Sequence, residues 1–347
     1  MDVRSTAYIS PFLVFHSILI GSNVTMKKAL CIFLSCIALI IVACTPRSAG
    51  ILRPGIVQIG PTDRALHSPI WSPDGKMIAT TSITNVQSWT SEIYIVELST
   101  NIIRSIEKTD YGNLEAQSWS PDGKSIAFVS QRGGDWPEGI WVTDLNGVHR
   151  KQFITEGYDV AWSPDGNSMA VFSTTIEDGD ETRTLSILDL TTMSKRVIFS
   201  GMGKYSTAIG LTWSPDGTKL MFSFGKQEYD VSPRFPNIDV YVIDISTGES
   251  VIITNKDVNL DPTWSPAGKL IAYIRNTAGH FDPKLTISNV DGSCPQQITN
   301  IAWSTDWSPD GRKIAFENGG NIYVMALSEF LGYDLLEKGL LCSDVEK

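Results

Sequence analysis

The sequence is short of positive charge and of histidine. Its 347 residues include 28 Lys and Arg, 38 Asp and Glu, and four His. Removal of a leader ending at residue 43, argued below, leaves three histidines and a net charge of −12. Nucleic acids are bound largely through Lys and Arg, so this deficit argues against a nucleic-acid partner. It says little about protein partners, because acidic surfaces often serve only solubility.

Motifs that carry catalytic or cofactor chemistry are also missing. The chain has no G-x-S-x-G elbow, no H-E-x-x-H, no paired C-x-x-C and no P-loop. The stretch from Gly201 to Lys204 resembles a phosphate loop only superficially, because Tyr205 stands where Ser or Thr is required. These absences favour a protein that is not an enzyme and has no cofactor.

Cysteine is scarce. Cys31 and Cys36 lie in the expected leader and Cys44 at its end, which leaves Cys294 and Cys342 for the folded part. An oxidising compartment would allow these two to form a disulfide that pins the C-terminal tail to the fifth repeat. Two free thiols are an equally open alternative, because spacing does not fix geometry.

A six-fold repeat is the main positive feature of the chain. The motif WSPDG occurs five times and the variant WSPAG once, with spacings of 48, 43, 51, 51 and 43 residues. The motifs start at Trp71, Trp119, Trp162, Trp213, Trp264 and Trp307. This period is typical of the four-stranded blades of a β-propeller. We therefore predict an all-β fold with six four-stranded blades.

Each motif reads as a tight turn between two strands. Proline presets φ at the second turn position, Asp suits the third, and Gly accepts positive φ at the fourth. Apolar, β-branched runs flank the motif, and five of the six units continue into a third and a fourth strand. We expect the six Trp side chains to pack between neighbouring blades.

The sixth unit lacks a fourth strand after Met325. The missing strand is available at the other end, where Gly55 to Gly60 reads GIVQIG. We predict that this segment completes the last blade and closes the ring, which removes exposed edges. The propeller is expected over 55–327, followed by a C-terminal tail over 328–347.

The N-terminal region reads as a lipoprotein signal. A basic start at Met26–Lys28 precedes an apolar run from Ala29 to Ala43, which is too short for a comfortable membrane span. Its end, IVAC, resembles a bacterial lipobox, which implies lipid attachment at Cys44. An ordinary secretory signal with an accidental cysteine is the alternative.

The expected organisation is a signal region over 1–43 and a lipidated Cys44 with a tether over 44–54. The true start is expected at Met26, or the signal is longer. This places the protein outside the cytoplasm, held on a bacterial membrane by the lipid.

The repeat itself resembles a known family. WSPDGKxIAF, followed by IYV and then Asp, resembles the propeller repeat of the TolB family and that of prolyl oligopeptidase-like enzymes. The TolB resemblance implies an extracytoplasmic propeller that engages other envelope proteins. The chain departs from TolB in its lipobox and in having no space for the α/β domain that precedes that propeller. A hydrolase domain is not expected after Leu327.

Four residues are candidates for one mouth of the central channel. They lie three or four residues before a motif Trp, where the innermost strands begin, and are His67, Glu115, Asp159 and Asp261. Such a carboxylate cluster could hold a divalent cation through oxygen ligands. It could equally be a solvated rim, because nothing fixes ligand number or distance.

Aromatic residues gather in the loops between second and third strands. The binding-face candidates are Trp89, Trp136, Tyr229, Phe235, His280 and Phe281. Exposed aromatics on one face are typical of a contact surface. Packing of each ring under its own loop is the alternative.

The leading hypothesis is an envelope propeller that binds a protein or peptide and catalyses nothing. A metal-assisted hydrolase or lactonase that uses the channel carboxylates is the first alternative. A carbohydrate-binding envelope protein that stacks sugars on the loop aromatics is the second.

Overall fold

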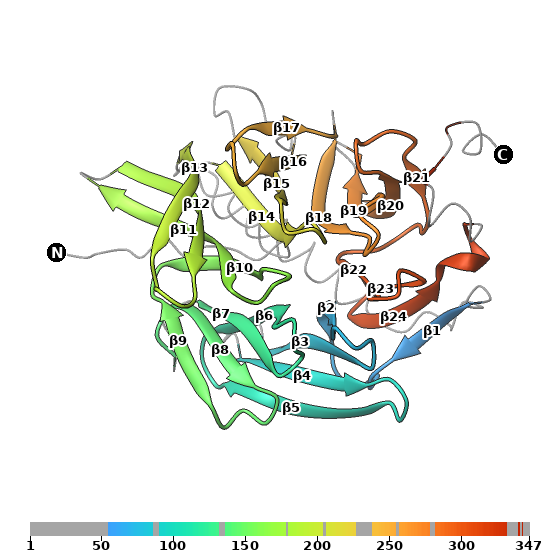
Figure 1. The fold of residues 1–347 in the computed structure, drawn as a ribbon. Helices are drawn as coiled ribbons and strands as arrows, with labels where there is room; N and C mark the ends of the chain where they lie inside the picture. Colours follow the sequence, from blue (N-terminus) through green and yellow to red (C-terminus); the bar gives the residue numbers. More distant parts are fainter. Residues whose placement is uncertain are drawn as a thin grey trace, which may run out of the picture.

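Six antiparallel sheets surround a central channel in the computed structural model (Figure 1). The structure describes residues 55–85, 90–131, 136–177, 180–203, 206–226, 238–254, 257–277, 282–331, 339, 340 and 342. Each sheet has four strands, as predicted. In the part of the chain so described, no helix is long and apolar enough to cross a membrane.

The first three blades follow one another along the chain. Blade 1 contains β2 (His67–Trp71), β3 (Met77–Asn85), β4 (Thr90–Glu97) and β5 (Ile102–Thr109). Blade 2 contains β6 (Asn113–Trp119), β7 (Ser125–Gln131), β8 (Gly139–Asp144) and β9 (Arg150–Ile154). Blade 3 contains β10 (Gly157–Trp162), β11 (Ser168–Glu177), β12 (Asp180–Asp189) and β13 (Lys195–Gly203).

The other three blades complete the ring. Blade 4 contains β14 (Ser206–Trp213), β15 (Lys219–Lys226), β16 (Asp239–Asp244) and β17 (Ser250–Ile252). Blade 5 contains β18 (Val258–Trp264), β19 (Leu270–Asn276), β20 (Lys284–Asn289) and β21 (Gln296–Gln297). Blade 6 contains β22 (Thr305–Trp307), β23 (Lys313–Asn318), β24 (Asn321–Ala326) and β1 (Ile56–Ile59), and a short 3₁₀ turn follows at Leu327–Glu329.

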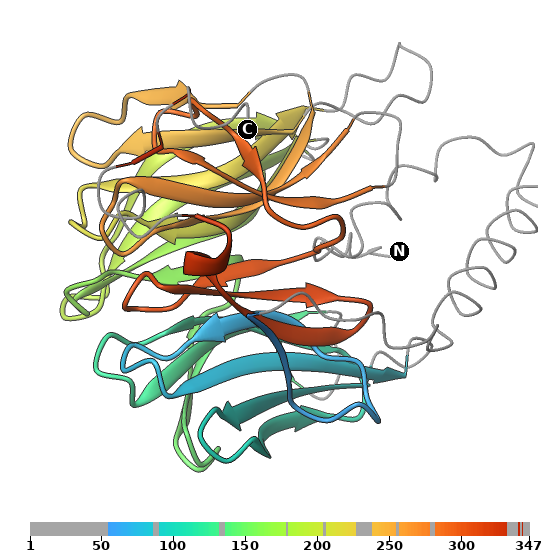
Figure 2. The same cartoon turned by 90° about the vertical axis from the view of Figure 1, so that its right-hand side faces the viewer.

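The N-terminal strand closes the ring, as the sequence predicts. β1 pairs with β24 in antiparallel register, with Ile56 opposite Met325 and Ile59 opposite Ile322. Both views place the blue N-terminal strand beside the red C-terminal ones (Figures 1 and 2). Closure gives blade 6 the same four strands as its neighbours and covers the edge of β24.

The motif turns satisfy their own polar groups. In blade 1 the Ser72 hydroxyl donates to Asp74 at 2.7 Å and accepts from the Met77 N–H at 2.9 Å. The Asp74 carboxylate also accepts the Lys76 N–H at 3.1 Å, and Gly75 has φ +70°. The serine and glycine backbone geometry recurs in blade 5, although Ala267 replaces the aspartate there.

Motif residues also connect neighbouring blades. The Trp119 indole donates to the Ile70 carbonyl at 3.1 Å, and the Trp213 indole donates to the Ala161 carbonyl at 3.0 Å. Trp71 packs in a cluster that contains Ala315 and Ile322 of blade 6. Every motif Trp belongs to a core cluster, or packs against one, that includes residues of the preceding blade. The expected inter-blade packing of these side chains is confirmed.

A disulfide joins Cys294 to Cys342, which decides between the two alternatives left open by the sequence. Cys294 lies in the turn between β20 and β21, so the bond ties the C-terminal tail to blade 5. The tail is also held by Asn289, which donates to the Leu340 carbonyl at 3.0 Å and accepts from the Leu340 N–H at 2.7 Å.

Candidate functional site at the channel mouth

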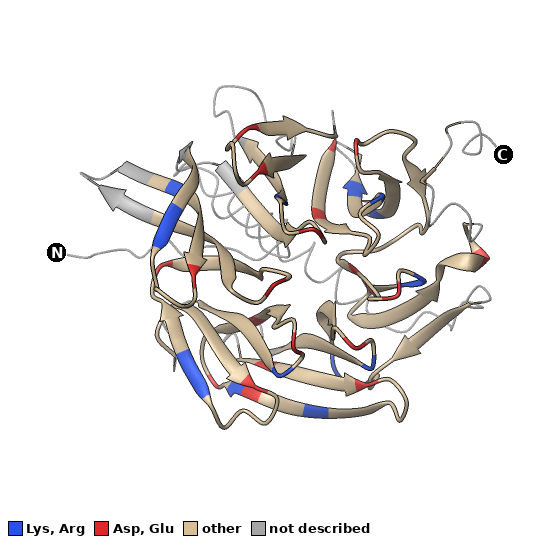
Figure 3. Ribbon diagram, viewed as in Figure 1, with Lys and Arg blue, Asp and Glu red and all other residues tan. Residues whose placement is uncertain are grey.

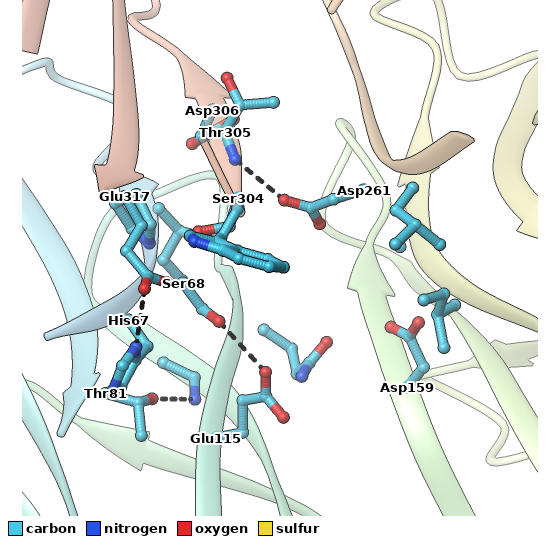
Figure 4. Close-up of a pocket in the computed structure, with 18 of the residues that line it drawn as sticks. His67, Ser68, Thr81, Glu115, Asp159, Asp261, Ser304, Thr305, Asp306 and Glu317 are labelled. Atoms are coloured by element: carbon cyan, nitrogen blue, oxygen red, sulfur yellow. Dashed lines mark hydrogen bonds and ion pairs between the residues drawn. The ribbon is translucent and has the colours of Figure 1, made fainter. Parts of the chain in front are cut away.

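The innermost strands bring the channel-mouth candidates together. A cavity of about 160 Å³ lies where these strands begin, at the end of the channel opposite the motif turns. His67, Glu115, Asp159 and Asp261 all line it, together with Asp306 and Glu317 (Figure 4). The candidates therefore share one space, although they come from blades 1, 2, 3 and 5.

A local irregularity in the innermost strands turns these residues toward the channel. The pairing register shifts just before the motif Trp in five blades, for example between His67 and Ile70 and between Leu260 and Thr263. At the shift, Ser68 and Asp261 have φ of 51° and 50°, and Gly210 has φ 70°. Bulges of this kind are common beside functional sites because they redirect a side chain.

All three candidate carboxylates also link successive blades. Asp159 accepts the Leu211 N–H of blade 4 at 3.3 Å, and Asp261 accepts the Thr305 N–H of blade 6 at 2.9 Å. Glu115 accepts a hydrogen bond from the Ser68 hydroxyl of blade 1 at 3.2 Å. Each carboxylate therefore has a structural partner across a blade boundary, beside its position on the cavity wall.

Asp306 and Glu317 line the same cavity but were not predicted from the sequence. Asp306 accepts the Trp71 N–H at 2.7 Å and the Thr263 hydroxyl at 3.2 Å, so it joins blades 6, 1 and 5. Glu317, at the end of β23, pairs with His67 Nδ1 at 3.0 Å. The sequence signal for Asp306 is its position directly before a motif Trp. Ser118 holds the same position in blade 2, and its hydroxyl accepts the Trp162 N–H at 3.0 Å.

The cavity is strongly acidic within the protein. Figure 3 shows Lys and Arg residues on the outer strands β5, β9 and β13, away from the channel. Among the described residues that line the cavity, His67 is the one basic side chain. Carboxylates held this close in a low dielectric disfavour one another's ionisation.

Burial and mutual repulsion shift the titration of these groups. Burial, with repulsion from Glu115 and Asp261, raises the pKa of Asp159 to about 8 despite its backbone hydrogen bonds. Burial, with nearby acids including Asp306, raises the pKa of Asp261 to about 7, and burial raises the pKa of Asp306 to about 7. Burial opposes the charged form of His67, but the Glu317 carboxylate outweighs it and raises the His67 pKa.

The donor set does not match a metal centre. Within the described residues, no three His, Cys, Asp or Glu side chains are grouped so that they could hold a metal ion. Both carboxylate oxygens of Asp306 accept hydrogen bonds, and Asp159 and Asp261 each use an oxygen on a backbone N–H. We derive no metal-dependent step from this arrangement.

The loop aromatics divide into two groups. Trp89, Tyr229, Phe235, His280 and Phe281 lie outside the described residues, as does Cys44. Trp136 is described and half-buried. Its ring packs edge-on against Phe128 and Trp141, with centroid distances of 5.7 and 5.0 Å, and the Arg150 guanidinium lies 4.8 Å from its centroid. Trp136 therefore packs against residues of its own blade, and its place on a binding face stays a prediction.

Known sequences show where this propeller belongs. A family model described as the TolB beta propeller domain matches residues 56–235. The Tol-Pal system protein TolB of Francisella tularensis subsp. tularensis (strain WY96-3418) is 27% identical over 261 residues, which are 73% of this chain and 56% of that protein. The uncharacterized peptidase YuxL of Bacillus subtilis is 30% identical over 106 residues, 29% of this chain and 16% of that protein. The chain thus spans 56% or less of the length of these curated relatives.

Solved structures share the architecture at low sequence identity. The putative TolB from Agrobacterium tumefaciens superposes with a TM-score of 0.58 at 19% identity, over 78% of this chain and 96% of that one. An oligogalacturonate lyase in complex with manganese gives a TM-score of 0.53 at 14% identity, over 78% and 93%. These likenesses establish the fold alone. With the repeat, the ring closure and the family match taken together, the chain belongs to the family of TolB β-propeller domains.

Proposed function

We propose that this protein is a non-enzymatic binding module of the bacterial cell envelope, which takes a protein or peptide at the channel mouth. The observation that carries the proposal is the shared cavity, to which side chains from different blades contribute. Its carboxylates accept hydrogen bonds from neighbouring blades, so they also serve the fold. The Tol-Pal membership of the Francisella relative supports an envelope partner.

We further propose that a lipid on Cys44 holds the module on the membrane, outside the cytoplasm. The support is the lipobox-like IVAC sequence after a basic start and an apolar run. Cys44→Ser should then abolish lipid attachment and leave the precursor uncleaved before residue 44. Mass spectrometry of the mature N-terminus checks this, and an unmodified N-terminus at another residue in the wild-type protein would refute it.

Two exposed apolar residues offer a matched test of the binding face. Tyr111 lies between β5 and β6 at the mouth and is 56% exposed, whereas Val148 lies between β8 and β9 at the motif-turn end and is 67% exposed. A photoreactive phenylalanine analogue at Tyr111 should cross-link the partner in intact envelopes, and one at Val148 should not. Equal yields at both positions, or a yield only at Val148, would contradict the proposed face.

An enzymatic role is the second candidate, because several carboxylates share one cavity. A lyase or lactonase of this kind would turn over a glycan or lactone, and Asp159→Asn with Asp261→Asn would abolish that turnover. Assays of the purified full chain, with and without added divalent ions, separate this candidate from the binding module.

A further inference from the structure

The cavity wall at blade 2 carries polar atoms that the fold leaves unused. Asn113 and Gln131 are register partners at the mouth ends of β6 and β7, and they are 2% and 8% exposed. Both line the cavity, and neither side-chain oxygen has a hydrogen-bond partner in the described part of the chain. A buried acceptor without a partner destabilises a fold by about 1 to 3 kcal/mol, so such groups require an explanation.

The neighbours of these two oxygens are also acceptors. Glu115 follows Asn113 by two residues on the same strand, is 7% exposed, and accepts a hydrogen bond from the Ser68 hydroxyl. The hydroxyl oxygens of Ser304 and Thr305, on the blade 6 side of the cavity, likewise have no partner among the described residues. The side-chain oxygens of Asn113, Gln131 and Glu115 therefore call for a ligand that donates several hydrogen bonds, and the blade 6 hydroxyls can accept hydrogen bonds from the same ligand.

The charge and the size of the cavity restrict the chemical class of the ligand further. Among the lining residues that the structure describes, carboxylates outnumber the single basic side chain, His67, which is already paired with Glu317. Trp303 adds an aromatic ring, and the face of such a ring attracts cations. The volume of about 160 Å³ is roughly ten times what one ordered water needs, so it admits a side chain but not a folded domain.

We propose that the cavity binds the ammonium group of a lysine side chain that a partner peptide inserts, with Glu115 as its charge partner and Asn113 and Gln131 as its neutral acceptors. The inference rests on the proposed function, which it deepens by naming the group recognised. An ammonium group has three donors and no acceptor, which matches the unused oxygens. Its charge would also offset the repulsion among Glu115, Asp159 and Asp261.

The direct test measures binding of two matched peptides to the purified full chain by calorimetry. One is acetyl-Gly-Gly-Lys-Gly-Gly-amide, and the other has norleucine in place of lysine, so the two differ only at the end of one side chain. We expect the lysine peptide to bind at least about tenfold more tightly, the scale of a hydrogen bond to a charged group. Equal affinity of the two peptides would overturn the inference.

Three variants locate the binding. Glu115→Gln keeps the side-chain size and should weaken lysine-peptide binding by about tenfold or more. Gln131→Met replaces an unpaired oxygen by an apolar chain, so it should weaken binding by about three- to tenfold while leaving thermal stability equal or higher. Glu107→Gln is the control, because Glu107 is equally buried but does not line the cavity. Unchanged binding in the first two variants, with folding confirmed by circular dichroism, would contradict the site.

Competing ligands distinguish the remaining outcomes. Binding of calcium or manganese chloride together with failure of the lysine peptide would overturn the inference in favour of a metal site. Partner cross-linking at Tyr111 without lysine-peptide binding would reject the ammonium site and leave the proposed function intact. Equal binding of putrescine and the peptide, without any cross-linked partner, would support the ammonium site and reject the peptide-binding function.

Discussion

The two ends of the innermost strands differ in how far their residues repeat from blade to blade. At the turn end, Ser-Pro-x-Gly repeats in all six blades, and the motif proline of one blade lies beside the motif glycine of the next. A Cβ added at these glycines would meet the proline Cδ at 3.7 to 4.0 Å, an ordinary contact. At the mouth end, the corresponding positions vary among Ser, Ala, Asp and Gly: they are Ser68, Ala116, Asp159, Gly210, Asp261 and Ser304.

The difference between these ends shows how a repeat separates structure from recognition. In five blades the turn serine donates to the turn aspartate, whereas buried acceptors at the mouth, such as those of Asn113 and Gln131, have no partner among the described residues. A uniform ring of turns can only build the propeller, because six equal positions select no ligand. A mouth that varies from blade to blade can hold a ligand in one orientation.

Opening the ring should cause the largest loss of stability, because it disturbs both the turn end and the mouth end of the propeller. Deletion of 55–60 removes β1 and exposes the edge of β24, and Ile59→Ala alone should lower the free energy of unfolding by about 2 to 5 kcal/mol. Val57 lies on the same strand but is 61% exposed, so Val57→Ala should stay within about 0.5 kcal/mol. Denaturant titration compares the variants, and an unaffected deletion variant would refute the role of β1 in closure.

Backbone strain introduced at the turn end should cause the next largest loss of stability. Gly123 has φ 69°, and a Cβ there would have room beside Pro73, so Gly123→Ala tests backbone strain without a clash. We expect a loss of about 1 to 2 kcal/mol in unfolding free energy, because non-glycine residues disfavour this region. Ser118, at the opposite side of the motif, should keep its hydrogen bond to Trp162. A stability loss near zero would show that the turns do not limit stability.

Acid groups at the mouth should make stability fall as pH rises. The Asp159 pKa of about 8 exceeds its ordinary value of 3.8, so the folded state holds more protons than the unfolded state between those values. Stability contributed by the protonated form is present below about pH 4 and is lost as pH rises through about 8. Asp261 and Asp306 act in the same direction up to about pH 7, and so does His67 with its raised pKa.

Asp159→Asn should flatten that pH dependence, since the amide oxygen can still accept the Leu211 N–H but cannot ionise. Thermal unfolding between pH 4 and pH 9 measures the slope for the wild-type protein and the variant. A wild-type melting temperature that rises across this window would contradict the assigned titration.

The smallest effect concerns the one irregular turn. Ala267 stands where five other turns have Asp, and those carboxylates accept a serine hydroxyl and a backbone N–H. Ala267→Asp should supply the same contacts to Ser265 and Lys269 and raise the unfolding free energy by about 0.5 to 1.5 kcal/mol. Asp122→Ala is the reciprocal change and should lower it by a similar amount.

The sequence was sufficient to predict the architecture because the blade motif occurs six times. The turn chemistry, the blade number and the closing role of Gly55 to Gly60 all follow from motif spacing and from the missing fourth strand after Met325. The shared position of His67, Glu115, Asp159 and Asp261 around one cavity also follows from their distance to the motif Trp. Each of these features could be predicted from the positions of residues relative to the motif along the chain.

Features that depend on contacts between strands could not be predicted from the sequence. Asp306 and Glu317 line the cavity and contact residues of other blades, Asp306 through Trp71 and Thr263 and Glu317 through His67. The half-buried state of Trp136 depends on Phe128, Trp141 and Arg150, whose proximity no local pattern encodes. The disulfide required the tail to return to blade 5, a path that spacing does not define.

One paired measurement tests the division between the two strand ends most directly. Gly123→Ala and Gln131→Met are each assayed for unfolding free energy and for lysine-peptide affinity. Gly123→Ala should lower stability by about 1 to 2 kcal/mol and leave affinity unchanged. Gln131→Met should weaken affinity by about three- to tenfold without loss of stability. If both variants changed the same property, or if Gln131→Met lowered stability and left affinity intact, the division of roles would be wrong.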